Sequence, residues 1–321
     1  MKKFVSILLV LVLMMSLSVA AFADGKTPAE ASPAPTTATL AKVVTVTNDG
    51  TKMPGQTFSF EVGKVSVTDA AADVTLANMP VPTVDSVTYA EGESGSKTLT
   101  INLPEYTSVG VYTYTITENA GSTAGMVYDT ASRTLKVTVV NGTTEGTFAV
   151  AGTVLVGTDN KKSDSFNNEY QAGSLEITKT VTGNLGDKSK DFTFTVTLNA
   201  PEGKTVSSTI KVAGRDASFV SGQTYTFTLK HGESYTFGNL PYGVTYEVVE
   251  ADYTAAGYTT TKTGDTGTIG AATQTAAFIN DKNDGNLDLG VSMDSLPYIL
   301  MLVVVGAAVV VIATRKKGEQ F

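Results

Sequence analysis

The sequence predicts an all-β protein built from two tandem β-sandwich domains. Short alternating segments dominate, such as T-F-S-F-E-V at 57–62, where Phe58, Phe60 and Val62 would share one face. Only 17% of the 321 residues are charged, whereas there are 13 Tyr and 13 Phe, a composition that favours strands over helices. Segments of the first half recur in the second half in the same order, which indicates two copies of one fold.

The repeat sets the domain boundaries. D-F-T-F-T-V-T-L at 191–198 matches the earlier segment at 57–62. We therefore expect a first domain at 39–171 and a second at 172–283, with a short join. Within the first domain, Asn141-Gly142 follows the strand-like run T-L-K-V-T-V-V and predicts a hairpin.

Both ends of the chain have the features of an exported and anchored protein. Residues 1–23 contain an early Lys pair, an apolar run and A-F-A, which predicts a signal peptide. Residues 24–38 are rich in Pro, Ala and Thr and are expected to be disordered. A polar linker at 284–294 precedes an apolar stretch at 295–314 that is long enough to span a bilayer, and the basic tail at 315–321 is expected in the cytoplasm. The domains should therefore lie outside the cell.

Composition and spacing exclude several classes of function. A net charge of −8 argues against nucleic-acid binding, and the absence of Cys excludes disulfides and a thiol nucleophile. The single histidine, His231, lies in a predicted hairpin turn without a second metal ligand. The segment from Asp281 resembles a calcium loop, but Gly285 is one position early and Ser292 replaces the final Glu. We expect no metal, no cofactor and no enzyme that turns over a substrate.

Each domain has three polar side chains on otherwise apolar strand faces. The order along the chain is Lys, Glu, Asn in both domains, and such an arrangement occurring twice argues for a repeated chemical device. The first set is Lys42, Glu118 and Asn168, and the second set is Lys179, Glu250 and Asn280.

A buried set of this kind could form an amide cross-link. Burial lowers the pKa of a lysine, which makes the amine a nucleophile, and raises that of a carboxyl group, which could then donate to the Asn carboxamide oxygen. Attack of Lys Nζ on Asn Cγ would release ammonia and join the first and last strands of a domain. The reaction occurs once per molecule. The alternative is that each Lys faces solvent at a strand edge or is merely paired with its Glu.

These motifs resemble those of the major (backbone) pilins of Gram-positive bacteria. The resemblance rests on L-E-I-T-K-T-V-T-G, on N-L-P-Y-G-V-T-Y-E-V-V-E and on F-I-N. It implies two Ig-like (CnaB-type) domains with intramolecular Lys–Asn isopeptide bonds. Lys42–Asn168, assisted by Glu118, and Lys179–Asn280, assisted by Glu250, would be the two bonds.

The resemblance also implies polymerisation by a sortase, which cuts a C-terminal motif and joins the new end to a lysine of the next subunit. L-D-L-G replaces the usual motif, with the cut between Leu289 and Gly290, and a plain membrane anchor is the alternative. L-P-Y-I-L at 296–300 begins like the common motif but lacks its Thr-Gly. The candidate sorting residues are Leu287, Asp288, Leu289 and Gly290, and the candidate acceptors are Lys161 and, less favoured, Lys162.

The chain is therefore predicted to be a structural shaft subunit of a cell-surface pilus, held in the plasma membrane as a precursor. Its partners would be identical subunits, a sortase, a peptidoglycan or membrane anchor, minor pilins and host surface ligands. The alternative function is a non-polymerised wall- or membrane-anchored adhesin or stalk protein. A ladder of covalent polymers would distinguish the two.

Overall fold

A computed structural model describes residues 34–48, 50–159, 161–162 and 165–283. Within this part of the chain, no helix is long and apolar enough to cross a membrane. The predicted signal peptide, most of the lead-in, the linker with its sorting residues Leu287–Gly290, the apolar stretch and the basic tail lie outside the described residues.

The described chain is all-β, as predicted, with a single short 3-10 helix in the described part. The first domain contains β1 (Thr37–Val46), β2 (Gln56–Phe58), β3 (Phe60–Thr68), β4 (Thr83–Val84), β5 (Val87–Tyr89), β6 (Gly95–Asn102), β7 (Gly110–Glu118), β8 (Met126–Val127), β9 (Arg133–Asn141), β10 (Phe148–Val156) and β11 (Ser165–Tyr170). The second contains β12 (Ala172–Thr182), β13 (Phe192–Asn199), β14 (Thr209–Val212), β15 (Arg215–Ser218), β16 (Gln223–Leu229), β17 (Ser234–Pro241), β18 (Thr245–Glu250), the helix η1 (Thr254–Ala256), β19 (Thr259–Thr263), β20 (Thr266–Thr268) and β21 (Thr273–Asp281).

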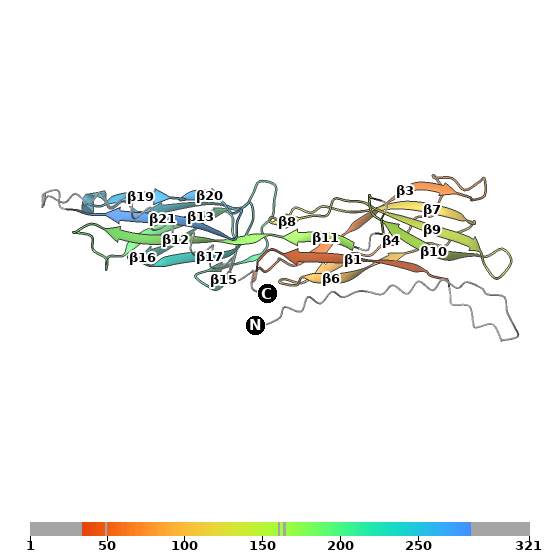
Figure 1. Ribbon diagram of the computed structural model, residues 1–321, viewed down its shortest axis with the longest axis horizontal. Coiled ribbons are helices and arrows are strands. Elements are labelled where there is room, and N and C mark those ends of the chain that lie inside the picture. Colours follow the sequence, from red (N-terminus) through yellow and green to blue (C-terminus); the bar gives the residue numbers. More distant parts are fainter. Residues whose placement is uncertain (1–33, 49, 160, 163–164, 284–321) are drawn as a thin grey trace. The chain divides into compact units, whose positions relative to one another are not determined.

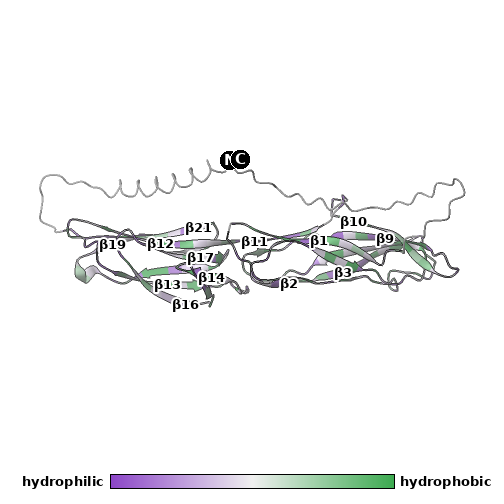
Figure 2. Ribbon diagram, turned by 90° about the horizontal axis from the view of Figure 1, so that it is seen from below, coloured by the Kyte–Doolittle hydropathy of each residue, from purple (hydrophilic) through white to green (hydrophobic). Residues whose placement is uncertain are grey.

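Two principal sheets enclose the core of each domain. The strand orders in the first domain are β4-β6-β1-β11-β8 and β10-β9-β7-β3, with β2 and β5 as a separate pair. Those in the second domain are β15-β14-β17-β12-β21-β19 and β16-β13-β18-β20. Apolar side chains from the facing sheets form one buried cluster per domain. The alternation of hydrophobic and hydrophilic residues along the strands is visible in Figure 2.

The first and last strands of each domain are paired in parallel. β1 lies beside β11, and β12 lies beside β21 (Figure 1). Only Gln171 separates β11 from β12, so the last strand of the first domain leads directly into the first strand of the second. Within each domain, the parallel pairing of the first and last strands places residues that are far apart in the sequence on neighbouring strands.

Two details of the first domain differ from the predictions. The segment 57–62 is not one strand, because β2 pairs with β5, whereas β3 pairs with β7; the break is at Ser59, whose carbonyl accepts a hydrogen bond from Asn119 N–H at 3.0 Å. β1 begins at Thr37, inside the lead-in predicted to be disordered, because it pairs with Asn102 of β6. The predicted hairpin after Asn141 is confirmed as β9–β10.

Candidate functional site

The predicted Lys–Glu–Asn sets occupy equivalent positions in the two domains. In the first, Lys42 is opposite Phe166 and Val44 is opposite Asn168. In the second, Lys179 is opposite Phe278 and Val181 is opposite Asn280. The Lys and the Asn are therefore offset by two residues on neighbouring strands in both domains, which places their side chains on the same face of the sheet.

The glutamates approach from the opposite sheet, again at equivalent positions. Glu118 of β7 is opposite Phe60 of β3, and Glu250 of β18 is opposite Phe194 of β13. The aromatic partners are also repeated. Phe60 packs on Phe166 with ring centroids 5.1 Å apart, and Phe194 packs on Phe278 with centroids 5.2 Å apart. The two domains thus present the same side chains from the same elements.

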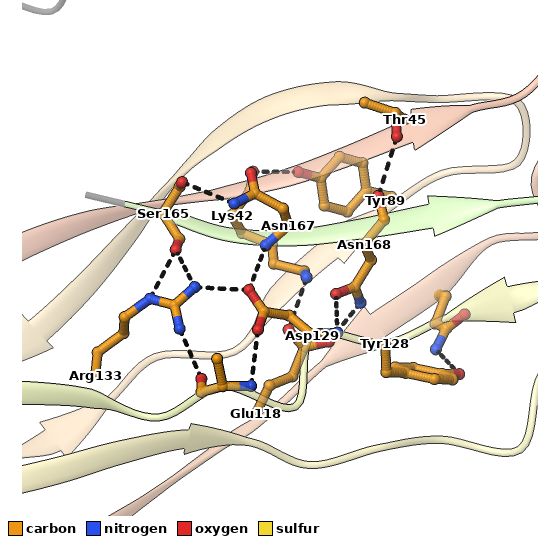
Figure 3. A network of polar contacts seen from close by, with 12 residues as sticks. Lys42, Thr45, Tyr89, Glu118, Tyr128, Asp129, Arg133, Ser165, Asn167 and Asn168 are labelled. Carbon is orange, nitrogen blue, oxygen red and sulfur yellow. Dashed lines mark hydrogen bonds and ion pairs between the residues drawn. The ribbon is translucent and has the colours of Figure 1, made fainter. Parts of the chain in front are cut away.

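In the first domain, Glu118 contacts both other members of the set. Lys42 Nζ donates to Glu118 Oε2 at 2.7 Å, and Asn168 Nδ2 donates to Glu118 Oε1 at 2.5 Å (Figure 3). The Lys42 and Glu118 side chains have 0% exposure, and Asn168 has 2%. The lysine is therefore not at a solvent-facing edge, and its ammonium group lies 4.6 Å from the centre of the Phe58 ring.

In the second domain, both partners contact the same carboxylate oxygen. Lys179 Nζ forms an ion pair with Glu250 Oε1 at 2.8 Å, and Asn280 Nδ2 donates to that oxygen at 2.8 Å. Lys179 and Asn280 are buried, and the Lys179 ammonium lies 4.2 Å from the centre of the Phe192 ring. Glu250 Oε2 and Asn280 Oδ1 have no hydrogen-bond partner among the described residues.

Burial shifts the pKa values in the directions that favour reaction. It lowers the pKa of Lys42 below the ordinary lysine value, although the hydrogen bond and charge of Glu118 oppose the shift. It likewise lowers the pKa of Lys179 and raises the pKa of Glu250. In the second domain, burial therefore favours a neutral amine beside a neutral carboxylic acid.

The orientation of the carboxamide differs from the prediction. We expected the glutamic acid to donate to the Asn oxygen, but in both domains the Asn amide nitrogen faces the carboxyl group. In the first domain this orientation has an independent cause, because the backbone N–H of Asp129 donates to Asn168 Oδ1 at 2.8 Å. Glu118 is consequently placed between the amine that would attack and the amide nitrogen that would leave.

Asp129 and Arg133 are part of this site but were not predicted from the sequence. Arg133 Nη2 donates to Asp129 Oδ2 at 2.7 Å, and both side chains are largely buried. A signal was available for Arg133, which shares the inward face of β9 with Leu135 and Val137. Asp129 lies in the irregular segment before β9, and its contact with Asn168 is made by the backbone, so no side-chain pattern indicates it.

The other predicted residues lie apart from these sets. The Lys161 side chain is 84% exposed, near Asp159, and Lys162 forms a β-bridge with Val156. His231 lies between β16 and β17, where its Nδ1 accepts a hydrogen bond from Val181 N–H at 3.0 Å. In the described part of the chain, no group of three or more His, Cys, Asp or Glu residues is arranged to hold a metal ion.

Comparisons with known proteins find an isopeptide-containing domain family and pilus proteins. Residues 38–171 match the family described as "Spy0128-like isopeptide containing domain", and residues 173–282 match a "Domain of unknown function (DUF7601)". A pilin of Streptococcus pyogenes serotype M1 is 31% identical over 302 residues, which cover 84% of this chain and 88% of that protein. The pilus tip adhesin Cpa of Streptococcus pyogenes is 36% identical over 116 residues, which cover 34% of this chain and 17% of that protein.

Solved structures that resemble this chain are also pilins. The major pilin of Streptococcus pyogenes superimposes with a TM-score of 0.57 at 29% identity, covering 79% of this chain and all of that chain. The T-13 major pilin of the same species gives a TM-score of 0.52 at 25% identity, covering 78% of this chain and 98% of that chain.

Proposed function

Because this chain belongs to the family of Gram-positive major pilins, we propose that it is a pilus shaft subunit in which a Lys–Asn isopeptide bond closes each domain. The bonds would join Lys42 to Asn168 and Lys179 to Asn280. The observation that carries the proposal is the repeated geometry: two buried sets of the same three residue types, at the same strand register, one in each domain.

The reaction needs only the three side chains of each set. In the first domain, a proton passes from Lys42 Nζ to Glu118 along their 2.7 Å hydrogen bond, which leaves a neutral amine. The amine attacks Asn168 Cγ; the Nζ–Cγ bond forms and the Cγ–Nδ2 bond breaks. Nδ2 takes the proton from Glu118 and leaves as ammonia. The attacking nitrogen gives its second proton to the Glu118 carboxylate, which passes it to the departing ammonia or to solvent and so returns to its ionised starting state. The net change is one ammonia lost per bond.

Three physical features support this chemistry. Burial disfavours the charged ammonium and so favours the nucleophilic form. The sheet holds amine and amide on adjacent strands, which removes most of the entropic cost of bringing them together. Glu118 contacts the attacking and the leaving nitrogen at the same time, as a proton shuttle requires.

The position of the bonds suits a protein that bears tension. Each bond would link the first and last strands of its domain, β1 to β11 and β12 to β21. A force applied along the chain would then load a covalent bond instead of the hydrogen bonds between parallel strands. The bond would also restrict the unfolded chain, as a disulfide does.

Polymerisation by a sortase is the second part of the proposal. The exposed Lys161 is a suitable acceptor because its amine is accessible, and Leu287–Gly290 is the candidate cut site. Such a subunit would be found at the cell surface, covalently joined to identical subunits. The similarity to a tip adhesin covers a third of the chain and favours, as the second candidate, an anchored adhesin or stalk that does not polymerise.

The intact mass of the full chain, purified in detergent, tests the cross-links. We expect a deficit of two ammonia molecules against the mass calculated from its own N-terminus, and no deficit in a Glu118→Ala, Glu250→Ala double variant. A folded parent chain without any deficit would refute the cross-links. Boiled cell-envelope extracts test polymerisation, because a shaft subunit gives a ladder that disappears when Leu287–Gly290 is deleted, whereas an adhesin gives one band.

A further inference from the structure

A buried network holds Asn168 in the first domain. The chain leaves β8 at Val127 and passes beside β11, where the backbone N–H of Asp129 donates to Asn168 Oδ1 at 2.8 Å. The Asp129 carboxylate in turn accepts hydrogen bonds from the backbone N–H groups of Asn167 and Ala131, each at 2.9 Å. These bonds fix the position of the Asp129 backbone relative to the strand that carries Asn168 (Figure 3).

Arg133 completes the network from the other side. Its Nη2 donates to Asp129 Oδ2 and to the Ser165 carbonyl, both at 2.7 Å, and its Nη1 donates to the Ala131 carbonyl at 2.7 Å. Its guanidinium carbon lies 4.5 Å from the centre of the Phe166 ring, and Arg133 is 6% exposed. Because a buried ion pair often stabilises a fold no more than apolar residues would, this arrangement calls for a role beyond stability.

We propose that the Asp129 N–H is the oxyanion donor for formation of the Lys42–Asn168 bond, and that the Asp129–Arg133 pair positions it. The inference rests on the cross-linking function proposed above. Attack of Lys42 on Asn168 Cγ transfers negative charge to Oδ1. A donor held in place beforehand, at a distance of about 2.7–3.1 Å, stabilises that charge without reorganisation. The same bond keeps Nδ2, the leaving nitrogen, directed at Glu118.

The second domain has no equivalent donor in the described part of the chain. Asn280 Oδ1 is buried without a hydrogen-bond partner there. The reason lies in the neighbouring strand: β19 continues in regular register beside β21, with Thr260 opposite Asn280, so its backbone is committed to the sheet. β8 is only two residues long and ends before it reaches Asn168, which frees the following backbone to turn toward the side chain.

The second domain therefore provides an internal reference for the test. The full chain is pulse-labelled, sampled over time, and digested, and the peptide pairs Lys42–Asn168 and Lys179–Asn280 are quantified in the same sample. For Asp129→Ala we expect the first bond to form about 10 to 100 times more slowly, somewhat less than the loss of a whole oxyanion donor, because the N–H remains but is no longer fixed. Asp129→Asn and Arg133→Gln should give intermediate rates. The second bond should form at its normal rate.

Two controls separate this role from a general loss of stability. Tyr112→Phe removes a buried hydrogen bond of the same domain, from the hydroxyl to the Ser108 carbonyl, and should leave the rate unchanged. In a Lys42→Met chain, which cannot react, Asp129→Ala should shift the 13C resonance of Asn168 Cγ, whereas Tyr112→Phe should not. A purely structural role for Asp129 would leave that resonance in place.

The outcomes distinguish the inference from the function on which it rests. A parent chain with neither bond would refute the cross-linking function itself. A parent with both bonds, together with normal rates for the first bond in Asp129→Ala, would refute only the role of Asp129. If Asp129→Ala does not fold, Asp129→Asn decides: a normal rate with an unshifted Asn168 Cγ resonance overturns the proposal.

Discussion

The two domains hold the same three residue types at the same register, but the hydrogen-bond partners of these side chains differ. In the first domain, Lys42, Glu118 and Asn168 all have hydrogen-bond partners, and the Asn168 oxygen is bound by Asp129 N–H. In the second domain, Glu250 Oε2 and Asn280 Oδ1 are buried without partners among the described residues, and Lys179 Nζ has an ion pair but no well-aligned hydrogen bond. Each buried polar group left unpaired costs about 1–3 kcal/mol.

This difference indicates two routes to one product. The proposed cross-link would make the Lys179 nitrogen part of an amide, so in the second domain the reaction would relieve an unfavourable buried arrangement. In the first domain the starting state is better satisfied, and the same contacts that satisfy it would also stabilise the oxyanion. Reactivity would come from an unsatisfied starting state in one domain and from a positioned donor in the other.

Removing one cross-link at a time should cause the largest loss of unfolding free energy. Asn168→Ala and Asn280→Ala should each abolish one bond. Each of these bonds closes a loop of about 100 to 125 residues, so either variant should lose about 5 kcal/mol of unfolding free energy. Denaturant unfolding, with the intact mass as a check that one ammonia is retained, measures it. Equal stability of the parent and a variant would mean that the corresponding bond does not constrain its domain.

Breaking the Asp129–Arg133 ion pair of the first domain should lower the unfolding free energy by a somewhat smaller amount. Arg133→Met leaves the Asp129 carboxylate buried without its ion-pair partner, which should cost about 3 kcal/mol. The experiment is done in an Asn168→Ala background so that the cross-link does not mask the change. Arg215→Met, at an exposed position of β15 in the second domain, is the matched control and should leave unfolding unchanged. A loss of less than half the expected size would show that the pair is dispensable for folding.

Much of this comparison could be predicted from the sequence, because strands alternate with a period of two. Lys42, Glu118 and Asn168 interrupt apolar faces, and the structure buries them where that alternation predicts. The split of 57–62 into β2 and β3 was not predictable in this way. Both halves keep the alternating pattern, and only the change of partner strand at Ser59 separates them.

The surroundings of the sites were much harder to predict than the sites themselves. Asp129 acts through its backbone N–H, which every residue except proline has, so the sequence Y-D-T-A-S-R carries no specific signal for it. Which atom of the Asn carboxamide faces Glu118 depends on that same contact. Periodicity identifies inward side chains, whereas the direction of a loop backbone depends on where β8 ends, which the alternation does not specify.

Stability of the two unlinked domains should depend differently on pH. In Glu250→Ala, burial lowers the pKa of Lys179 without the opposing carboxylate, so between the folded pKa and the ordinary value of 10.5 the unfolded chain binds more protons. The unfolding free energy should therefore rise with pH through this window, by at most about 1.4 kcal/mol per unit, and level off above it. In Glu118→Ala the rise should be smaller, because Asp129 still attracts the Lys42 charge more than Arg133 repels it.

Urea unfolding of both variants from neutral pH to above 10.5 measures this difference. A Lys179→Met, Glu250→Ala double variant should lose the pH dependence of the second domain and serves as the control. Identical slopes for the two single variants would mean that Asp129 and Arg133 do not alter the charge state of Lys42, and a flat profile for Glu250→Ala would mean that Lys179 escapes to solvent.

The smallest expected effect on the unfolding free energy concerns the backbone of the two buried lysines, Lys42 and Lys179. The Lys42 carbonyl accepts a hydrogen bond from the Tyr89 hydroxyl at 2.6 Å, whereas the Lys179 carbonyl accepts one from the Gly232 backbone N–H at 2.8 Å. Burial raises the pKa of Tyr89 to about 12, so its hydroxyl remains a donor at all ordinary pH values. In an Asn168→Ala background, Tyr89→Phe should cost about 1 kcal/mol of unfolding free energy. The loss should be similar for Tyr114→Phe, whose hydroxyl, like that of Tyr89, has two partners: the Pro80 carbonyl at 2.7 Å and the Tyr106 hydroxyl at 3.5 Å. With Asn168 present, the cross-link should still form, since Tyr89 contacts the main chain of Lys42 and not its amine. Loss of the ammonia deficit in Tyr89→Phe alone would instead mean that the first domain positions its lysine, as well as its asparagine, through side chains that the second domain lacks.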